Sequence, residues 1–149
     1  MRIIVGCLVL KKNKFVIVKE AKKSCYGEWN LPLGHLEENE IIIDGAKRES
    51  EEETGLKLEL KGFIGIYQHK SKTDGKSVIK IIFEADTDDD KLKVPKEEIL
   101  DAKWVSLEEF NQIPEKEIRN LDIRTVINDY FKKGSLNLDY IKINSLLKK

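Results

Sequence analysis

Two short stretches decide how this chain folds: GHLEENE at residues 34–40 and, after seven further residues, RESEEETGL at residues 48–56. The sequence over residues 40–54 has helical character, and Gly55 is a typical C-terminal cap for such a helix. Gly34 opens the preceding loop, where the lack of a side chain lets the backbone come close to the helix. We therefore expect a loop that lies against a helix ending just before Gly55.

One face of this predicted helix is acidic. Each helical residue turns by about 100°, so Glu49, Glu52 and Glu53 fall within an arc of roughly 100°. Like charges at this spacing repel and destabilise a helix. Arg48 can pair with Glu52, but one guanidinium cannot neutralise every acid. Hard divalent cations such as Mg²⁺ or Mn²⁺ prefer carboxylate oxygens and water, so the pattern predicts a metal-binding face.

The spacing distinguishes this segment from an ordinary solvated glutamate run, which is otherwise the commoner interpretation. Residues 34–56 follow the pattern G-x5-E-x7-R-E-U-x-E-E-x-G-U, where U is a bulky aliphatic residue, with Ser50 as the exception. A chance match of its fixed identities has a probability on the order of 10⁻⁶. On these residues the chain resembles the Nudix hydrolase family. WNLPLGHLE at 29–37 and AKWVSLEE at 102–109 extend the resemblance. The sequence WNLPLGHLE, together with the tail at 118–141, is most similar to bacterial nucleoside tri- and diphosphate phosphatases of the NudJ type.

The resemblance implies an α/β/α sandwich around a mixed central sheet. Irregular alternation of strand and helix patterns along the chain also favours a mixed sheet. We expect a single domain over residues 1–149, with the Nudix box at 34–56 and a helical tail at about 117–149. Within that tail, residues 117–131 have the pattern of an amphipathic helix and residues 136–147 a weaker one.

The resemblance also implies the chemistry, which is Mg²⁺-dependent hydrolysis of a phosphoanhydride bond by a metal-activated water, with Mn²⁺ as a possible substitute. Glu49, Glu52 and Glu53 would ligate the metal ions, and Glu49 or Glu53 would help to activate the water. Arg48 would orient the glutamates through an ion pair.

Further ligands would come from outside this acidic face. Glu40 would support the helix and join the outer metal shell, and the carbonyl of Leu33 or Gly34 would be another ligand. A later acid, Glu97 or Glu98, is the candidate for an additional ligand, with a solvated loop acid as the equal alternative.

Three residues are candidates for substrate binding. His35 follows the loop glycine and can reach a phosphate, with a structural hydrogen bond as the alternative. Trp29 and Tyr67 have rings that can stack on a base, although aromatic residues near a sheet more often belong to the core.

Ser50 stands where the family packs a large aliphatic side chain on the sheet. Together with Ala46 one turn earlier, this small residue predicts an unusually close approach of the helix.

The composition argues against nucleic-acid-coating and membrane proteins. The 149 residues contain 27 basic and 27 acidic side chains, a balance that is not typical of a duplex-coating or membrane-surface protein. No apolar run approaches the roughly 20 residues that span a bilayer. We expect a cytoplasmic monomer or homodimer with Cys7 and Cys25 as reduced thiols.

The substrate stays open at this point. A nucleoside tri- or diphosphate or a related organic pyrophosphate is expected first. RNA 5′-end pyrophosphate removal is the alternative within enzymes. A Nudix-fold binding or sensor protein without turnover is the alternative outside them, and such proteins usually lack one or more of the box glutamates.

Overall fold

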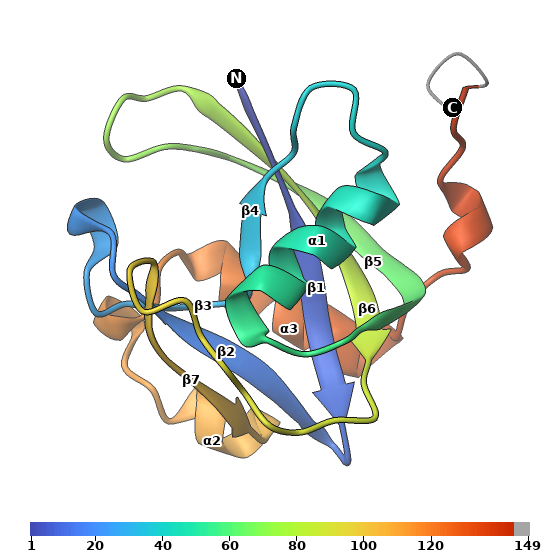
Figure 1. The fold of residues 1–149 in the computed structure, drawn as a ribbon. Coiled ribbons are helices and arrows are strands. Elements are labelled where there is room, and N and C mark those ends of the chain that lie inside the picture. Colours follow the sequence, from blue (N-terminus) through green and yellow to red (C-terminus); the bar gives the residue numbers. More distant parts are fainter. Residues whose placement is uncertain (145–149) are drawn as a thin grey trace.

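A seven-stranded mixed sheet forms the centre of the protein in the computed structural model, which describes residues 1–144 (Figure 1). Strand β1 lies in the middle, antiparallel to β2 and β4 and parallel to β6. Strand β5 pairs with β6, and β3 and β7 pair with β2. The strands are β1 Arg2–Lys11, β2 Lys14–Glu20, β3 Trp29–Asn30, β4 Leu33–His35, β5 Glu59–Lys70, β6 Ser77–Asp86 and β7 Ile99–Val105.

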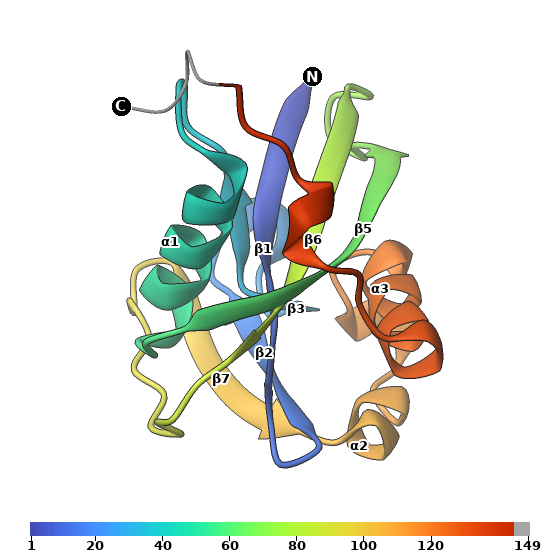
Figure 2. The same cartoon turned by 90° about the vertical axis from the view of Figure 1, so that its right-hand side faces the viewer.

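Helices cover both faces of the sheet. Figure 2 shows α1 on one side and α2 and α3 on the other. The α-helices are α1 Ile42–Thr54, α2 Leu107–Asn111 and α3 Leu121–Lys133, and the 3-10 turns are Lys23–Cys25, Glu115–Glu117 and Leu138–Tyr140. This arrangement confirms the predicted α/β/α sandwich.

The two layers arise from the alternation of apolar side chains along the central strand. Successive side chains of a strand point to opposite faces of the sheet. Leu8 of β1 therefore joins a core with Ile123 and Ile127 of α3, whereas its neighbour Cys7 joins a second core with Ala46 of α1. All five residues are fully buried.

Ser50 fixes α1 to the sheet through hydrogen bonds. Its buried hydroxyl accepts a hydrogen bond from the backbone N–H of Cys7 (2.9 Å) and donates one to the carbonyl of Pro32 (2.7 Å). The helix is thus linked both to β1 and to the segment that enters β4. The serine replaces apolar packing by a polar bridge, as the small side chain at this position allows.

Helix α1 ends as the sequence predicts, whereas the tail differs from expectation. Gly55 caps α1 with a φ of +73°. Helix α3 covers 121–133 instead of 117–131, because Asn120 is extended and Gly134, at a φ of +73°, stops the helix. After Gly134 the described chain contains no α-helix, only a β-bridge between Leu136 and Phe63 and the 3-10 turn Leu138–Tyr140, so the helical tail is wrong for residues 134–144. The rest of the predicted segment, 145–149, lies outside the described residues.

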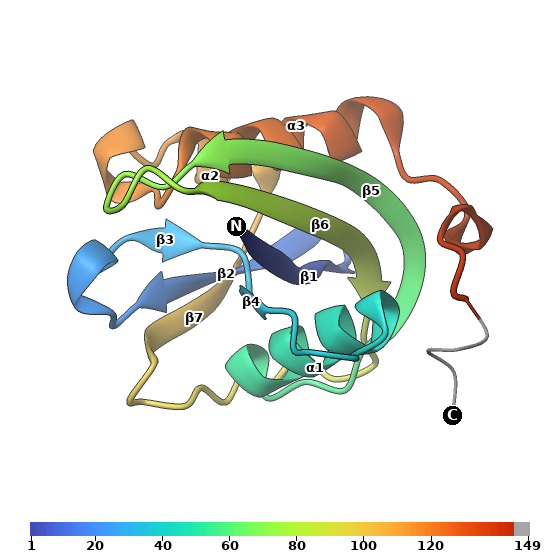
Figure 3. The ribbon, with the colours of Figure 1, turned by 90° about the horizontal axis from the view of Figure 1, so that it is seen from above.

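Figure 3 shows the loop between β5 and β6 reaching over the end of the sheet where β3 lies. This end also carries β4 and the start of α3. None of the helices within residues 1–144 is both long and apolar enough to cross a bilayer.

Candidate metal and pyrophosphate site

The acidic face of α1 lies against the backbone of β4. A side-chain carbon at Gly34 would overlap the carboxylate of Glu49, so only glycine leaves room for that carboxylate. The expectation that Gly34 brings backbone close to the acidic face is therefore met.

Arg48 holds the acids of this region in fixed positions. Its guanidinium donates two hydrogen bonds to Glu40 (2.7 and 3.0 Å) and one to Glu49 (2.8 Å). It also donates to the carbonyl of His35 (3.1 Å) and lies 3.4 Å from the carboxylate of Glu52. Hydrogen bonding to Arg48 lowers the pKa of Glu40. Arg48 thus links His35, at the start of the loop between β4 and α1, to Glu40 near the end of that loop. It also links both to two glutamates of α1.

Glu53 is a buried carboxylate with an unpaired oxygen. It is 6% exposed, and its Oε1 has no hydrogen-bond partner among the described residues. Burial raises its pKa well above the usual value, and the negative charges of Glu20, Glu49 and Glu98 raise it further. Burial also raises the pKa of Glu49, against the opposing effect of Arg48. Such a group is costly to keep charged unless a cation binds to it.

These features fit a hard divalent cation. An unpaired buried oxygen, mutually repelling carboxylates and a glycine that leaves space beside one of them are what oxygen-ligated Mg²⁺ or Mn²⁺ needs. Within residues 1–144, no three His, Cys, Asp or Glu side chains already gather around one point. One oxygen of Glu49 is paired with Arg48 at 2.8 Å.

Two acids from other elements contribute to this region. Glu98, in the segment before β7, adds negative charge to both Glu49 and Glu53. Glu20 at the end of β2 was not predicted. It is 4% exposed and accepts a hydrogen bond from the side-chain nitrogen of Asn30 (2.8 Å). The only signal for Glu20 in the sequence is an acid at the end of an apolar strand.

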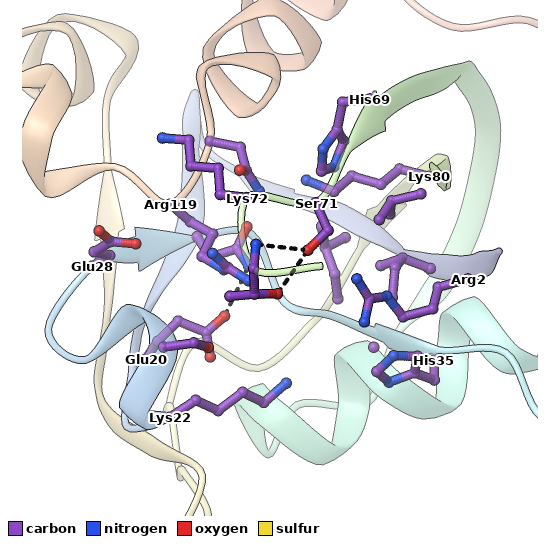
Figure 4. A pocket seen from close by; sticks show the side chains of 18 residues that line it. Arg2, Glu20, Lys22, Glu28, His35, His69, Ser71, Lys72, Lys80 and Arg119 are labelled. Carbon is purple, nitrogen blue, oxygen red and sulfur yellow. Dashed lines mark hydrogen bonds between the residues drawn. The ribbon is translucent and has the colours of Figure 1, made fainter. Parts of the chain in front are cut away.

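A cavity of about 290 Å³ opens beside the acidic face (Figure 4). Its lining includes Glu20, Gly34 and His35, so it borders the proposed metal ligands. Five basic and two acidic side chains line it, which gives an excess of positive charge. They are Arg2, Lys22, Lys72, Lys80 and Arg119, with Glu20 and Glu28. His35 also lines the cavity, and burial followed by the charges of Lys22 and Arg2 lowers its pKa.

Trp29 and Tyr67 lie outside the cavity lining. The ring of Trp29 is 7% exposed and packs in the core, with the ammonium groups of Lys19 and Lys103 over it at 5.4 and 4.7 Å. The hydroxyl of Tyr67 donates to Asp129 of α3 (3.0 Å). The structure therefore gives these rings packing roles and does not place them against a substrate in the cavity.

Comparison with known proteins agrees with this geometry. The NUDIX domain family matches residues 1–126. Nudix hydrolase 6 of Arabidopsis thaliana is 36% identical over 118 residues, which are 76% of this chain but only 42% of the plant protein. Human 8-oxo-dGDP phosphatase NUDT18 is 30% identical over 105 residues, 68% of this chain and 31% of its own length. The chain thus spans less than half of these two relatives.

Two further similarities cover most of both chains. Phosphatase NudJ of Escherichia coli is 32% identical over 109 residues, 72% of this chain and 70% of NudJ. A solved NUDIX hydrolase from Nitrosomonas europaea superposes with a TM-score of 0.84 at 26% identity, covering 96% of this chain and 97% of the other. With the family matched over most of its length, this chain belongs to the Nudix hydrolase family.

Proposed function

We propose that this protein is a Mg²⁺-dependent hydrolase that cleaves a phosphoanhydride bond in nucleoside di- or triphosphates or related organic pyrophosphates. One observation carries the proposal: the buried, incompletely paired carboxylate of Glu53 stands beside a cavity lined by an excess of cations. The acidic face is suited to hold metal ions, and the cationic lining is suited to hold a polyanionic substrate.

Each residue of the site has a distinct task in this proposal. Glu49, Glu52 and Glu53 hold the metal, and Glu49 or Glu53 accepts a proton from the attacking water. Arg48 keeps Glu49 in position through the 2.8 Å ion pair. When bound, the metal neutralises the pyrophosphate and lowers the pKa of a coordinated water.

Substrate phosphates enter from the cavity side. Lys22 lies close enough to Glu53 to lower its pKa and also acts on His35, so both basic side chains stand next to the acidic face. They are placed to bind the pyrophosphate and orient it toward the water. Two relatives bear names that contain the word phosphatase, one of them acting on a nucleoside diphosphate. We propose the same class of substrate here, with a cytoplasmic location.

The test is a panel of nucleoside di- and triphosphates, ADP-ribose and thiamine-type pyrophosphates, assayed with Mg²⁺ and with EDTA. Orthophosphate and pyrophosphate are measured separately. We expect turnover that requires Mg²⁺ and falls by at least about a hundredfold in Glu53→Gln. Glu38→Gln removes an exposed charge from the neighbouring loop and serves as the matched control. Turnover that persists in EDTA, or in Glu53→Gln, contradicts the proposal.

A further inference from the structure

Apart from Arg2, which pairs with Asp74 at 3.2 Å, the lysine, arginine and histidine side chains of the cavity fall into two sets on opposite sides. Figure 4 shows Lys22 and His35 on the side next to the acidic face, and His69, Lys72, Lys80 and Arg119 on the other side. The second set comes from β5, the β5–β6 loop, β6 and the segment before α3. The scissile pyrophosphate is proposed to lie next to the first set, beside the acidic face. The second set, called here the far wall, adds to the positive charge of the cavity, but no contact with that pyrophosphate has been assigned to it.

Lys80 is the most deeply buried member of the far wall. It is 4% exposed, and its ammonium lies 3.1 Å from Asp122 of α3. It also donates to the side-chain oxygen of Asn120 (3.1 Å) when that amide is oriented to suit its neighbours. Burial lowers the pKa of Lys80, Asp122 raises it, and the nearby positive charge of Arg119 lowers it again. Lys80 is thus paired with Asp122, repelled by Arg119 and more weakly attracted by Glu20.

The N-terminus of α3 adds to the positive potential at this wall. Asn120 is the N-cap residue, but its side chain makes no capping hydrogen bond. Asn120 and Arg119 both line the cavity, so the start of this 13-residue helix faces it. The first N–H groups of a helix and its dipole favour a bound anion. Asp122 in the first turn offsets part of this effect.

The described part of the lining contains no Phe, Tyr or Trp. Base recognition usually relies on such rings, and here Trp29 is turned into the core. Within the described lining, the charge of a substrate therefore offers more for recognition than the stacking of a ring does.

From these observations we infer that the preferred substrate carries a second phosphate on its organic part, bound at the far wall by Lys80, Arg119 and Lys72. The inference rests on the proposed function, because it places the scissile pyrophosphate at the acidic face. The substrate class is a small organic pyrophosphate, such as a sugar or nucleoside pyrophosphate, with an additional phosphate remote from the scissile bond.

The test compares ADP, ATP and adenosine 3′-phosphate 5′-diphosphate as substrates. The last compound differs from ADP only by a remote phosphate, whereas ATP adds a phosphate to the chain itself. We expect kcat/KM for the 3′-phosphorylated compound to exceed that for ADP by roughly 10- to 100-fold, the value of a charge-assisted contact. Arg119→Ala should bring this ratio close to one. Lys116→Ala removes an exposed charge from the 3-10 turn before Arg119 and should leave the ratio unchanged.

Binding to Glu53→Gln, measured by calorimetry with Mg²⁺, keeps the inference separate from catalysis. The inference predicts that Glu53→Gln binds the 3′-phosphorylated compound more tightly than ADP, and that the double variant with Arg119→Ala loses this difference. This result supports a phosphate site at the far wall even if no compound is turned over. Equal binding and equal turnover of the two refute the far wall but leave the proposed function standing. A preference for ATP over ADP that Arg119→Ala abolishes also refutes the inference. In that case the far-wall cations recognise the length of the phosphate chain and not a remote phosphate.

Discussion

Replacing Glu53 by glutamine tests whether this carboxylate is a metal ligand or a group that stabilises the fold. In a structural role the native residue stabilises the fold, and its replacement costs free energy. In the site described above, Glu53 is buried at 6% exposure, has an unpaired Oε1, and is repelled by Glu20, Glu49 and Glu98. Without metal, the charge of Glu53 therefore lowers the stability of the fold.

The size of the effect follows from the cost of an unpaired buried polar group, about 1–3 kcal/mol. Glutamine has the same shape but no charge, and its amide also lacks a partner. We therefore expect the metal-free Glu53→Gln protein to be more stable than the wild type by about 1–2 kcal/mol at about pH 8. The gain should shrink at lower pH. The pKa of Glu53 in the folded state lies above its ordinary value of 4.5, so stability falls as pH rises from there through the folded pKa.

The assay is urea unfolding in EDTA and in Mg²⁺ at about pH 5 and pH 8, with Glu38→Gln as the control for net charge. In the wild type, Mg²⁺ should stabilise more at the higher pH, because both Glu49 and Glu53 have raised pKa values. In Glu53→Gln most of this stabilisation should disappear. A metal-free Glu53→Gln protein that is less stable than the wild type, with an undiminished response to Mg²⁺, refutes the reasoning.

Three further substitutions test the parts around Glu53. Arg48→Ala should lower stability by about 2–4 kcal/mol, because it leaves several partly buried carboxylates without their cation; denaturant unfolding measures this, and a loss below about 0.5 kcal/mol contradicts the role of Arg48. Gly34→Ala should displace the Glu49 carboxylate and lower kcat by at least about tenfold, while far-UV circular dichroism stays native; unchanged kcat shows that the contact is dispensable. Ser50→Ala should cost about 1–3 kcal/mol by leaving the N–H of Cys7 unpaired, with kcat little affected; an unchanged Tm argues against the polar bridge.

The local features of the acidic face could be predicted from the sequence. Helix α1, its cap at Gly55 and the close approach of Gly34 follow from spacing, helical periodicity and the lack of a side chain. The structure adds the detail that Arg48 pairs most closely with Glu40 and Glu49. Geometry along one helix had indicated Glu52, which lies farther from the guanidinium at 3.4 Å.

Features that depend on tertiary packing could not be predicted from the sequence. Glu20 ends β2, Lys80 lies in β6 and Arg119 precedes α3. They are far apart in sequence, and only tertiary packing brings them to one cavity. Trp29 and Tyr67 illustrate the same limit. From the sequence their rings could stack on a base, with a core position as the commoner alternative, and only the structure shows the side chains that they contact.

The central claim is that the acidic face of α1 binds a divalent cation. Mn²⁺ titration followed by electron paramagnetic resonance tests it directly, because bound Mn²⁺ loses its free-ion signal. The account predicts saturable binding by the wild type, competition by Mg²⁺, and a loss of affinity of roughly 10- to 100-fold in both Glu49→Gln and Glu53→Gln, but not in Glu38→Gln. Equal Mn²⁺ affinity in all four proteins would contradict the account.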